Sequence, residues 1–187
     1  MNRKSANGGF TLIEALVVIA LTGILVALAV PSMRSTIERS SISSQVNSYI
    51  GALRLARSEA IKLGTTVKMC RSTAPEATTP SCAGVAGSWA SGWIVFIDRD
   101  DDGTLDTDDV LLRVQGAFSD SGGITSGSGA DIVYRFRPTG LLASGVDSLS
   151  FVSRSADATQ QRVVCVGLQG RARITTGGTS TCSSADS

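Results

Sequence analysis

Apolar residues fill the start of the chain almost without interruption. From residue 15 to residue 30 only Thr22 and Gly23 break the run. A helix from Phe10 to Val30 would be about 32 Å long, which is enough to cross the hydrocarbon core of a bilayer, and we expect residues 10–31 to form the membrane-spanning part of the first helix. The leader of residues 1–9 is short and basic, which is the charge order of a segment exported with its N-terminus in the cytoplasm.

Beyond Pro31 the apolar residues recur at every third or fourth position. This spacing is typical of one face of an amphipathic helix, and it predicts that residues 32–64 continue the first helix. Pro31 lacks an amide hydrogen and is expected to kink the helix or limit its regular hydrogen bonding, and Gly64 is expected to end the helix as a C-cap. The predicted apolar face consists of Val46, Tyr49, Ile50, Leu53, Ala56, Ala60 and Ile61.

From residue 65 onward short segments rich in Val, Ile, Phe and Thr alternate with turn signals. We predict an α+β fold, in which the long N-terminal helix lies against an antiparallel, β-rich domain of residues 65–187. The Ser- and Gly-rich segment 119–129 is expected to be a mobile loop. The expected strands are residues 65–71, 92–98, 110–115, 131–137, 148–153, 162–167 and 171–175.

Composition disfavours catalysis. The 187 residues are 42% hydrophobic and 18% charged, with a net charge of +1, four cysteines and no histidine. The lack of histidine removes Ser-His-Asp and Cys-His catalysis and every His-containing zinc site. The cysteines form no C-x-x-C pair, which disfavours thioredoxin chemistry and a zinc ribbon. We therefore expect a protein that is not an enzyme.

Glu14 is the one charge within the N-terminal apolar segment. A carboxylate in hydrocarbon costs roughly 2.5–3.5 kcal/mol on insertion scales and is seldom found there without a function. One interpretation is a secretory signal with a small-x-small cleavage site at residues 27–29. In the other, cleavage after Gly9 keeps the helix, and the new amino group of Phe10 pairs with Glu14 of a neighbouring subunit.

The same N-terminal residues resemble a known family. The stretch G-F-T-L-I-E from Gly9 to Glu14, the apolar run and Pro31 are similar to the class III signal of type IV pilins and pseudopilins. The resemblance implies cleavage by prepilin peptidase after Gly9, methylation of Phe10, and assembly with other pilins through the N-terminal helix. It also implies a single-pass protein of the bacterial inner membrane, with its C-terminal domain in the periplasm before it joins an extracellular pilus.

Three further motifs narrow the resemblance to the GspH/FimT group of minor pilins and pseudopilins. They are A-R-S-E-A-I at residues 56–61, G-W-I-V-F-I-D at residues 92–98 and G-R-A-R at residues 170–173, which resembles the G-R-x-R motif of FimT-like proteins. The resemblance to FimT-like proteins implies that the protein binds DNA during DNA uptake in natural transformation. The alternatives are a structural minor pilin that primes pilus assembly and the GspH-type pseudopilin of a type II secretion system.

The residues around G-R-A-R also predict an arginine-bearing hairpin with its turn at residues 168–170. In a strand, Arg171 and Arg173 project from one face about 7 Å apart, while Ala172 and Ile174 face the core. Guanidinium groups at that spacing suit neighbouring phosphates, although an ordinary solvated strand face is the alternative. We expect weak DNA binding without sequence preference. The expected DNA-binding residues are Gly170, Arg171 and Arg173, widened by Arg162 and Arg154.

The four cysteines are expected to form disulfides in an oxidising compartment. The sequence allows three pairings. We favour local pairing, in which Cys70–Cys82 closes a Pro- and Thr-rich loop and Cys165–Cys182 ties the C-terminal tail to a strand. Loops of this length predict about 3 kcal/mol of stabilisation per disulfide.

Residues 98–109 form a dense acidic run. Acidic residues at its positions one, three, five and nine, with glycine at six, match the calcium loop of an EF-hand, but position twelve is Asp109 rather than glutamate and strands flank the run. We favour a plain Asp-Gly hairpin turn without a cofactor and keep calcium as the alternative. The calcium ligands would be Asp98, Asp100, Asp102, Asp106 and Asp109.

Overall fold

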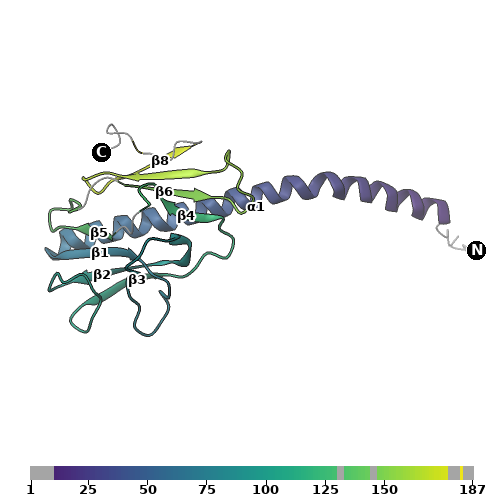
Figure 1. Cartoon of the computed structure of the whole chain (residues 1–187). Coiled ribbons are helices and arrows are strands. Elements are labelled where there is room, and N and C mark those ends of the chain that lie inside the picture. The colour runs from purple at the N-terminus through teal and green to yellow at the C-terminus, as the bar shows by residue number, and fades with distance from the viewer. Residues whose placement is uncertain (1–10, 130–132, 144–146, 177–181, 183–187) are drawn as a thin grey trace, which may run out of the picture. The chain divides into compact units, whose positions relative to one another are not determined.

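The computed structural model describes residues 11–129, 133–143, 147–176 and 182. Two compact units divide the chain, Met1–Ile37 and Glu38–Ser187. The first helix, α1 (Leu12–Leu63), is 52 residues long and contributes to both units (Figure 1). Gly9 and Phe10, where cleavage and methylation are predicted, lie outside the described residues.

In the first unit, the described part of α1 as far as Val30 is exposed, and from residue 15 to residue 30 it is apolar except for Thr22 and Gly23. Leu12, Ile19 and Leu28 are 79%, 68% and 73% exposed. By length and composition this part of the helix is able to cross a membrane, and lipid or neighbouring helices would cover its side chains. The helix continues through Pro31, which confirms the prediction that residues 32–64 extend the first helix. Proline removes one hydrogen bond, and the bonds on either side are sufficient to continue the helix.

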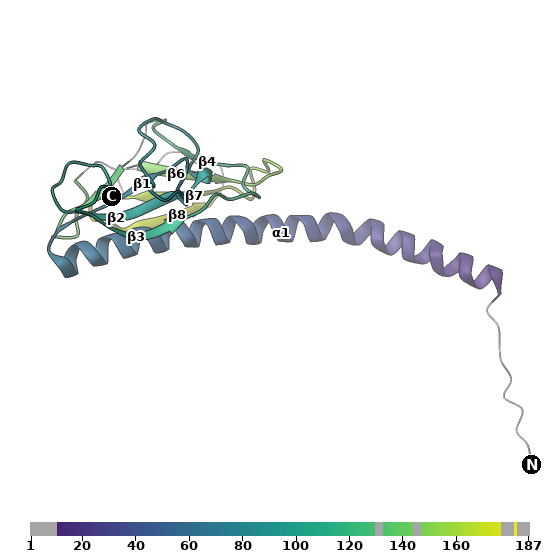
Figure 2. The same ribbon diagram turned by 90° about the horizontal axis from the view of Figure 1, so that it is seen from below.

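In the second unit, two antiparallel four-stranded sheets cover one side of α1 (Figure 2). The strand order is β3-β2-β1-β5 in the first sheet and β4-β6-β7-β8 in the second. The predicted α+β fold is confirmed. The first sheet consists of β1 (Thr66–Arg71), β2 (Trp93–Asp98), β3 (Val110–Gln115) and β5 (Val133–Phe136), and the second of β4 (Gly123–Ser126), β6 (Asp147–Val152), β7 (Arg162–Val166) and β8 (Ala172–Thr176), with the short 3-10 helix η1 (Trp89–Ser91) before β2.

Tyr49 lies at the centre of the core between α1 and the sheets. Its ring centroid is 5.6–6.1 Å from those of four other aromatic rings, and the ring is fully buried. The predicted apolar face of the helix is buried except for Ile61, which lies in the last turns of α1 and is 52% exposed. Gly64 ends the helix as predicted, with a φ of +64° and its N–H donated to the Ala60 carbonyl at 3.0 Å. The four rings around Tyr49 belong to Trp89, Trp93, Tyr134 and Phe151.

One predicted loop contains a strand. Within the segment 119–129, β4 pairs with β6 and places Ile124 opposite Phe151. Ile124 is fully buried, so this edge strand contributes a side chain to the core as well as pairing with β6. The other predicted strands agree with the structure to within one residue at each described end, and residues 131–132 of the predicted strand 131–137 lie outside the described residues.

Candidate functional site

Arg171 and Arg173 lie at the edge of the second sheet. Arg171 directly precedes β8, and Arg173 within β8 pairs with Cys165 of β7. Both arginines are exposed, and the neighbouring Ala172 is half-buried against the core, as predicted. Ile174 was expected in the core but is 46% exposed, so that prediction is wrong; β8 is an edge strand of the sheet among the described residues.

The turn between β7 and β8 is tight and rests on the body of the domain. Gly170 donates its N–H to the Gly167 carbonyl at 2.8 Å, which confirms the predicted turn. Gly170 has a φ of +67°, and a Cβ there would lie 2.8 Å from Phe136 Cε1 and 2.9 Å from the Gly140 carbonyl oxygen. Only glycine fits this position. Because Gly170 is buried, it positions the turn and does not itself offer a surface to DNA.

Arg57 of α1 also contacts this turn, which the sequence pattern did not predict. Its Cδ lies 3.3 Å from the place of a Cβ on Gly170, and the side chain is half-buried. Arg57 lies in the A-R-S-E-A-I stretch, so two of the motifs that resemble the GspH/FimT group meet in space. The apolar periodicity of residues 32–64 does not include Arg57 and gave no signal for this contact.

Arg162 and Arg154 do not extend the surface around Arg171. Arg162 pairs with Thr176 at the opposite end of β8, five residues or about 17 Å along the strand from Arg171. The Nη1 of Arg162 donates to the backbone carbonyls of Gln160 and Gln161 at 3.3 and 3.1 Å. The guanidinium group is therefore bound to its own turn.

Arg154 forms an ion pair of its own with Asp120, at 3.4 Å on the surface. It follows β6 near the same distant end of the sheet as Arg162, since Phe151 of β6 pairs with Arg162. The prediction that Arg154 and Arg162 widen the patch is wrong, because strand register could not be known from the sequence.

Both local disulfides form as predicted. Cys70 of β1 is bonded to Cys82, with 5.5 Å between their Cα atoms, and Cys165 of β7 is bonded to Cys182, with 5.7 Å between theirs. A small second core of Ile94 and Phe96 lies beside Cys70 on the face of the first sheet that carries the loop. One disulfide therefore attaches the loop around Cys82 to β1, and the other attaches the chain at Cys182 to β7.

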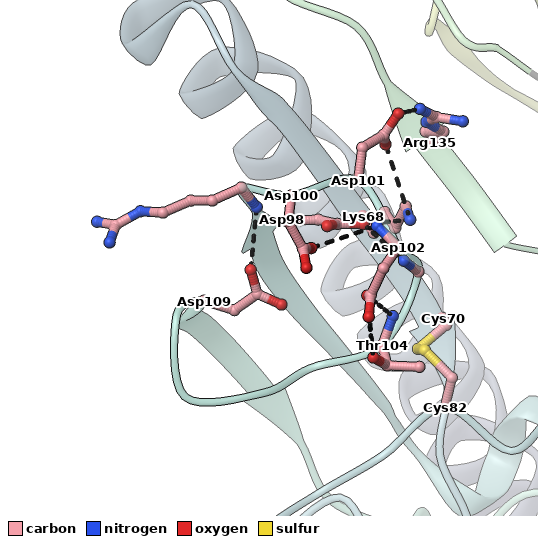
Figure 3. A network of polar contacts seen from close by, with 12 residues as sticks. Lys68, Cys70, Cys82, Asp98, Asp100, Asp101, Asp102, Thr104, Asp109 and Arg135 are labelled. Atoms are coloured by element: carbon pink, nitrogen blue, oxygen red, sulfur yellow. Dashed lines mark hydrogen bonds and ion pairs between the residues drawn. A yellow bond between two sulfur atoms is a disulfide. The ribbon is translucent and has the colours of Figure 1, made fainter.

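In the acidic hairpin between β2 and β3, two aspartates form ion pairs with basic side chains from neighbouring strands (Figure 3). Lys68 of β1 forms an ion pair with Asp98, and both side chains are almost completely buried. Arg135 of β5 forms an ion pair with Asp101, whose carboxylate is also 3.9 Å from the Lys68 ammonium group. Gly103 donates its N–H to Asp98 at 3.2 Å. The sequence alone did not reveal these ion pairs, because Lys68 and Arg135 lie on strands distant from the acidic run along the chain.

Only part of the predicted calcium ligand set comes together. One oxygen each of Asp98, Asp100 and Asp102 lies within 4.8 Å of the others. Asp109 instead accepts the N–H of Arg99 at 2.9 Å.

Asp106 likewise forms a hydrogen bond within the hairpin, because its carboxylate accepts the N–H of Asp108 at 2.9 Å. The N–H and hydroxyl of Thr104 lower the pKa of Asp102. Donors of the protein itself therefore hydrogen-bond to these carboxylates, and whether the run is a plain hairpin turn or a calcium site stays a prediction.

An exposed apolar N-terminal helix that continues under two antiparallel sheets defines a type IV pilin-like subunit. The family model described as Type II transport protein GspH matches residues 45–170, and the prokaryotic N-terminal methylation motif matches residues 4–30. The chain therefore belongs to the GspH family, among the type IV minor pilins and pseudopilins, which are structural subunits.

The chain is also similar to individual type IV pilins. The type IV major fimbrial protein FimA of Dichelobacter nodosus is 47% identical over 53 residues, which are 28% of this chain and 33% of FimA. The chain thus spans about a third of the length of the curated relatives it matches. The crystal structure of the type IV minor pilin FimU of Pseudomonas aeruginosa PAO1 is similar with a TM-score of 0.53 and 17% identity, covering 74% of this chain and 90% of FimU. At that identity the likeness shows the fold alone.

Proposed function

We propose that this protein is a minor pilin that binds DNA without sequence preference through the β7–β8 hairpin during DNA uptake. The observation that supports this most directly is the pair of exposed arginines, Arg171 and Arg173, on an edge strand next to a buried glycine turn. A planar guanidinium group binds a phosphate by two parallel hydrogen bonds, and two such groups suit a nucleic-acid backbone.

Affinity is expected to come from phosphate contacts alone. The aromatic side chains of the described residues are buried or half-buried, so no exposed ring among them is placed to stack on bases. Two or three phosphate contacts would give micromolar affinity at best, and binding would weaken steeply with salt. Duplexes of arbitrary sequence would be accepted.

The decisive experiment is gel retardation of a duplex of arbitrary sequence by the full chain in a non-ionic detergent at low salt. Arg171→Ala with Arg173→Ala should abolish retardation while leaving the thermal melting of the protein unchanged. Arg154→Ala with Arg162→Ala removes the same charge at the distant end of the sheet and should retain binding. Binding by the first double variant equal to that of the unmodified protein would contradict the proposed site.

Failure of the unmodified protein to bind DNA would favour the second candidate, a structural minor pilin or a type II secretion pseudopilin. The description of the matched family as a type II transport protein supports that candidate. Neither candidate requires a cofactor.

We further propose that assembly depends on processing at the N-terminus. Cleavage by prepilin peptidase after Gly9 would leave a methylated Phe10 at the start of the mature chain, anchored in the inner membrane with its β-rich domain in the periplasm. Glu14, in the exposed first turn of α1, would then pair with the Phe10 amino group of a neighbouring subunit.

Mass spectrometry of the membrane-extracted protein should show methylated Phe10, and an N-terminus at Val30 would contradict the assignment. Glu14→Ala should permit export but impair assembly.

A further inference from the structure

A second turn repeats the hydrogen bonding of the β7–β8 turn. Arg137 donates its N–H to the Leu141 carbonyl at 2.9 Å, and Gly140 donates to the Arg137 carbonyl at 2.8 Å. In the β7–β8 turn the corresponding bonds are 3.1 and 2.8 Å long. Gly140 has a φ of +78°, as Gly170 has a φ of +67° in the corresponding place. Both are three-residue turns closed by a glycine in the left-handed conformation.

The two turns lie side by side. Leu142, just after the second turn, donates its N–H to the carbonyl of Leu168 within the β7–β8 turn at 2.9 Å. The Gly140 carbonyl oxygen lies so close to Gly170 that a Cβ there would be 2.9 Å away. Both glycines are buried, and the close approach of the turns depends on Gly170 carrying no side chain, whereas a Cβ on Gly140 would meet Ile61 and Arg57 of α1.

The charged residues within the paired turns are all positive. Arg137 begins one turn and Arg171 ends the other, and both are exposed. Residues 137–143 and 167–171 contain no acidic residue. Arg57 lies beneath both turns, with its Nε 3.2 Å from the place of a Cβ on Gly140.

We infer that Arg137 is a third contact to the DNA backbone, so that the two paired turns together form the phosphate-binding surface. This inference rests on the proposed function. Backbones that exchange a hydrogen bond lie about 5 Å apart, and long arginine side chains on adjoining turns can reach successive phosphates. The surface thus continues from β8 across the paired turns, away from Arg162 and Arg154.

The salt dependence of DNA binding tests this inference, because each phosphate contact adds about 0.9 to the slope of log K against log salt. With contacts from Arg137, Arg171 and Arg173, a fourfold rise in salt should weaken duplex binding by about 40-fold. Arg137→Ala should reduce that loss to about 12-fold and weaken binding at low salt. Arg137→Lys should keep the full slope since it keeps the charge, and Arg154→Ala, at the distant end of the sheet, should change nothing.

These measurements use the full chain in non-ionic detergent, with thermal melting as the check on folding. If Arg137→Ala keeps the slope of the unmodified protein while the Arg171→Ala, Arg173→Ala variant loses binding, Arg137 is not a contact and the proposed function stands. If Arg137→Ala lowers the slope but the double variant binds as well as the unmodified protein, the second turn is a contact and the proposed hairpin site is wrong. An unmodified protein that binds no DNA overturns both.

Discussion

Replacing Gly170 by alanine should destabilise the domain far more than replacing a glycine of the same backbone conformation elsewhere. Alanine at a φ of +67° costs about 1–2 kcal/mol, because its Cβ crowds the following carbonyl. The new Cβ would also lie 2.8 Å from Phe136 Cε1 and 2.9 Å from the Gly140 carbonyl oxygen, both shorter than van der Waals contact. Overpacking of this kind costs about 1–3 kcal/mol, so the expected loss is about 2–5 kcal/mol.

Gly84 provides the matched control. It has the same φ of +67°, but a Cβ there would meet nothing within 4 Å. Gly84→Ala should therefore cost only the backbone strain, about 1–2 kcal/mol. The free energy of unfolding is measured by urea titration, followed by the fluorescence of Trp89 and Trp93, both of which are buried in the core. Equal losses in the two variants would refute the argument that the β7–β8 turn is wedged against Phe136 and Gly140.

Three other predictions concern the interior and the acidic hairpin. Millimolar calcium should leave the melting temperature unchanged, because Lys68 already neutralises Asp98; a rise with calcium would identify a metal site. Lys68→Met should cost about 3–5 kcal/mol in thermal or urea unfolding, since it leaves Asp98 buried without a cation, and a loss below 1 kcal/mol would contradict this. Burial raises the pKa of Tyr49 and of Tyr134 above that of tyrosines in the unfolded chain. The free energy of unfolding should therefore be at its full value below a pH of about 10 and should fall above it, because there only the unfolded tyrosines ionise. Tryptophan fluorescence should show alkaline unfolding, and an unchanged midpoint in Tyr49→Phe with Tyr134→Phe would refute this cause.

The helix and most strands could be predicted from the sequence because their signals are local. The spacing of Val46, Tyr49 and Leu53 places them on one helix face whatever covers that face. Strands such as residues 110–115 are bounded by turn residues and enriched in β-branched side chains. Segment 119–129 was misjudged because its composition is that of a loop, and only pairing with β6 makes it a strand.

The arrangement of the candidate site depends on pairings between distant segments. Arg162 and Arg171 are nine residues apart in number but lie at opposite ends of the β7–β8 pair, which only the register reveals. Arg137 is brought to Gly170 by a hydrogen bond between two turns. Local pairing of the cysteines could be predicted, since short loops close at the lowest entropic cost.

The placement of the disulfides has a mechanical consequence. Cys70–Cys82 and Cys165–Cys182 each stay within one sheet and its adjoining chain, and α1 contains no cysteine. If the chain is pulled from its ends, the segments enclosed by the two disulfides cannot extend. They span 12 and 17 residues, which correspond to about 40 and 60 Å of contour length. No covalent link prevents α1 from being drawn out of the domain. Resistance to a pull along the helix therefore comes from the interlocked side chains around Tyr49, and the disulfides limit how far each sheet unravels once that packing has yielded.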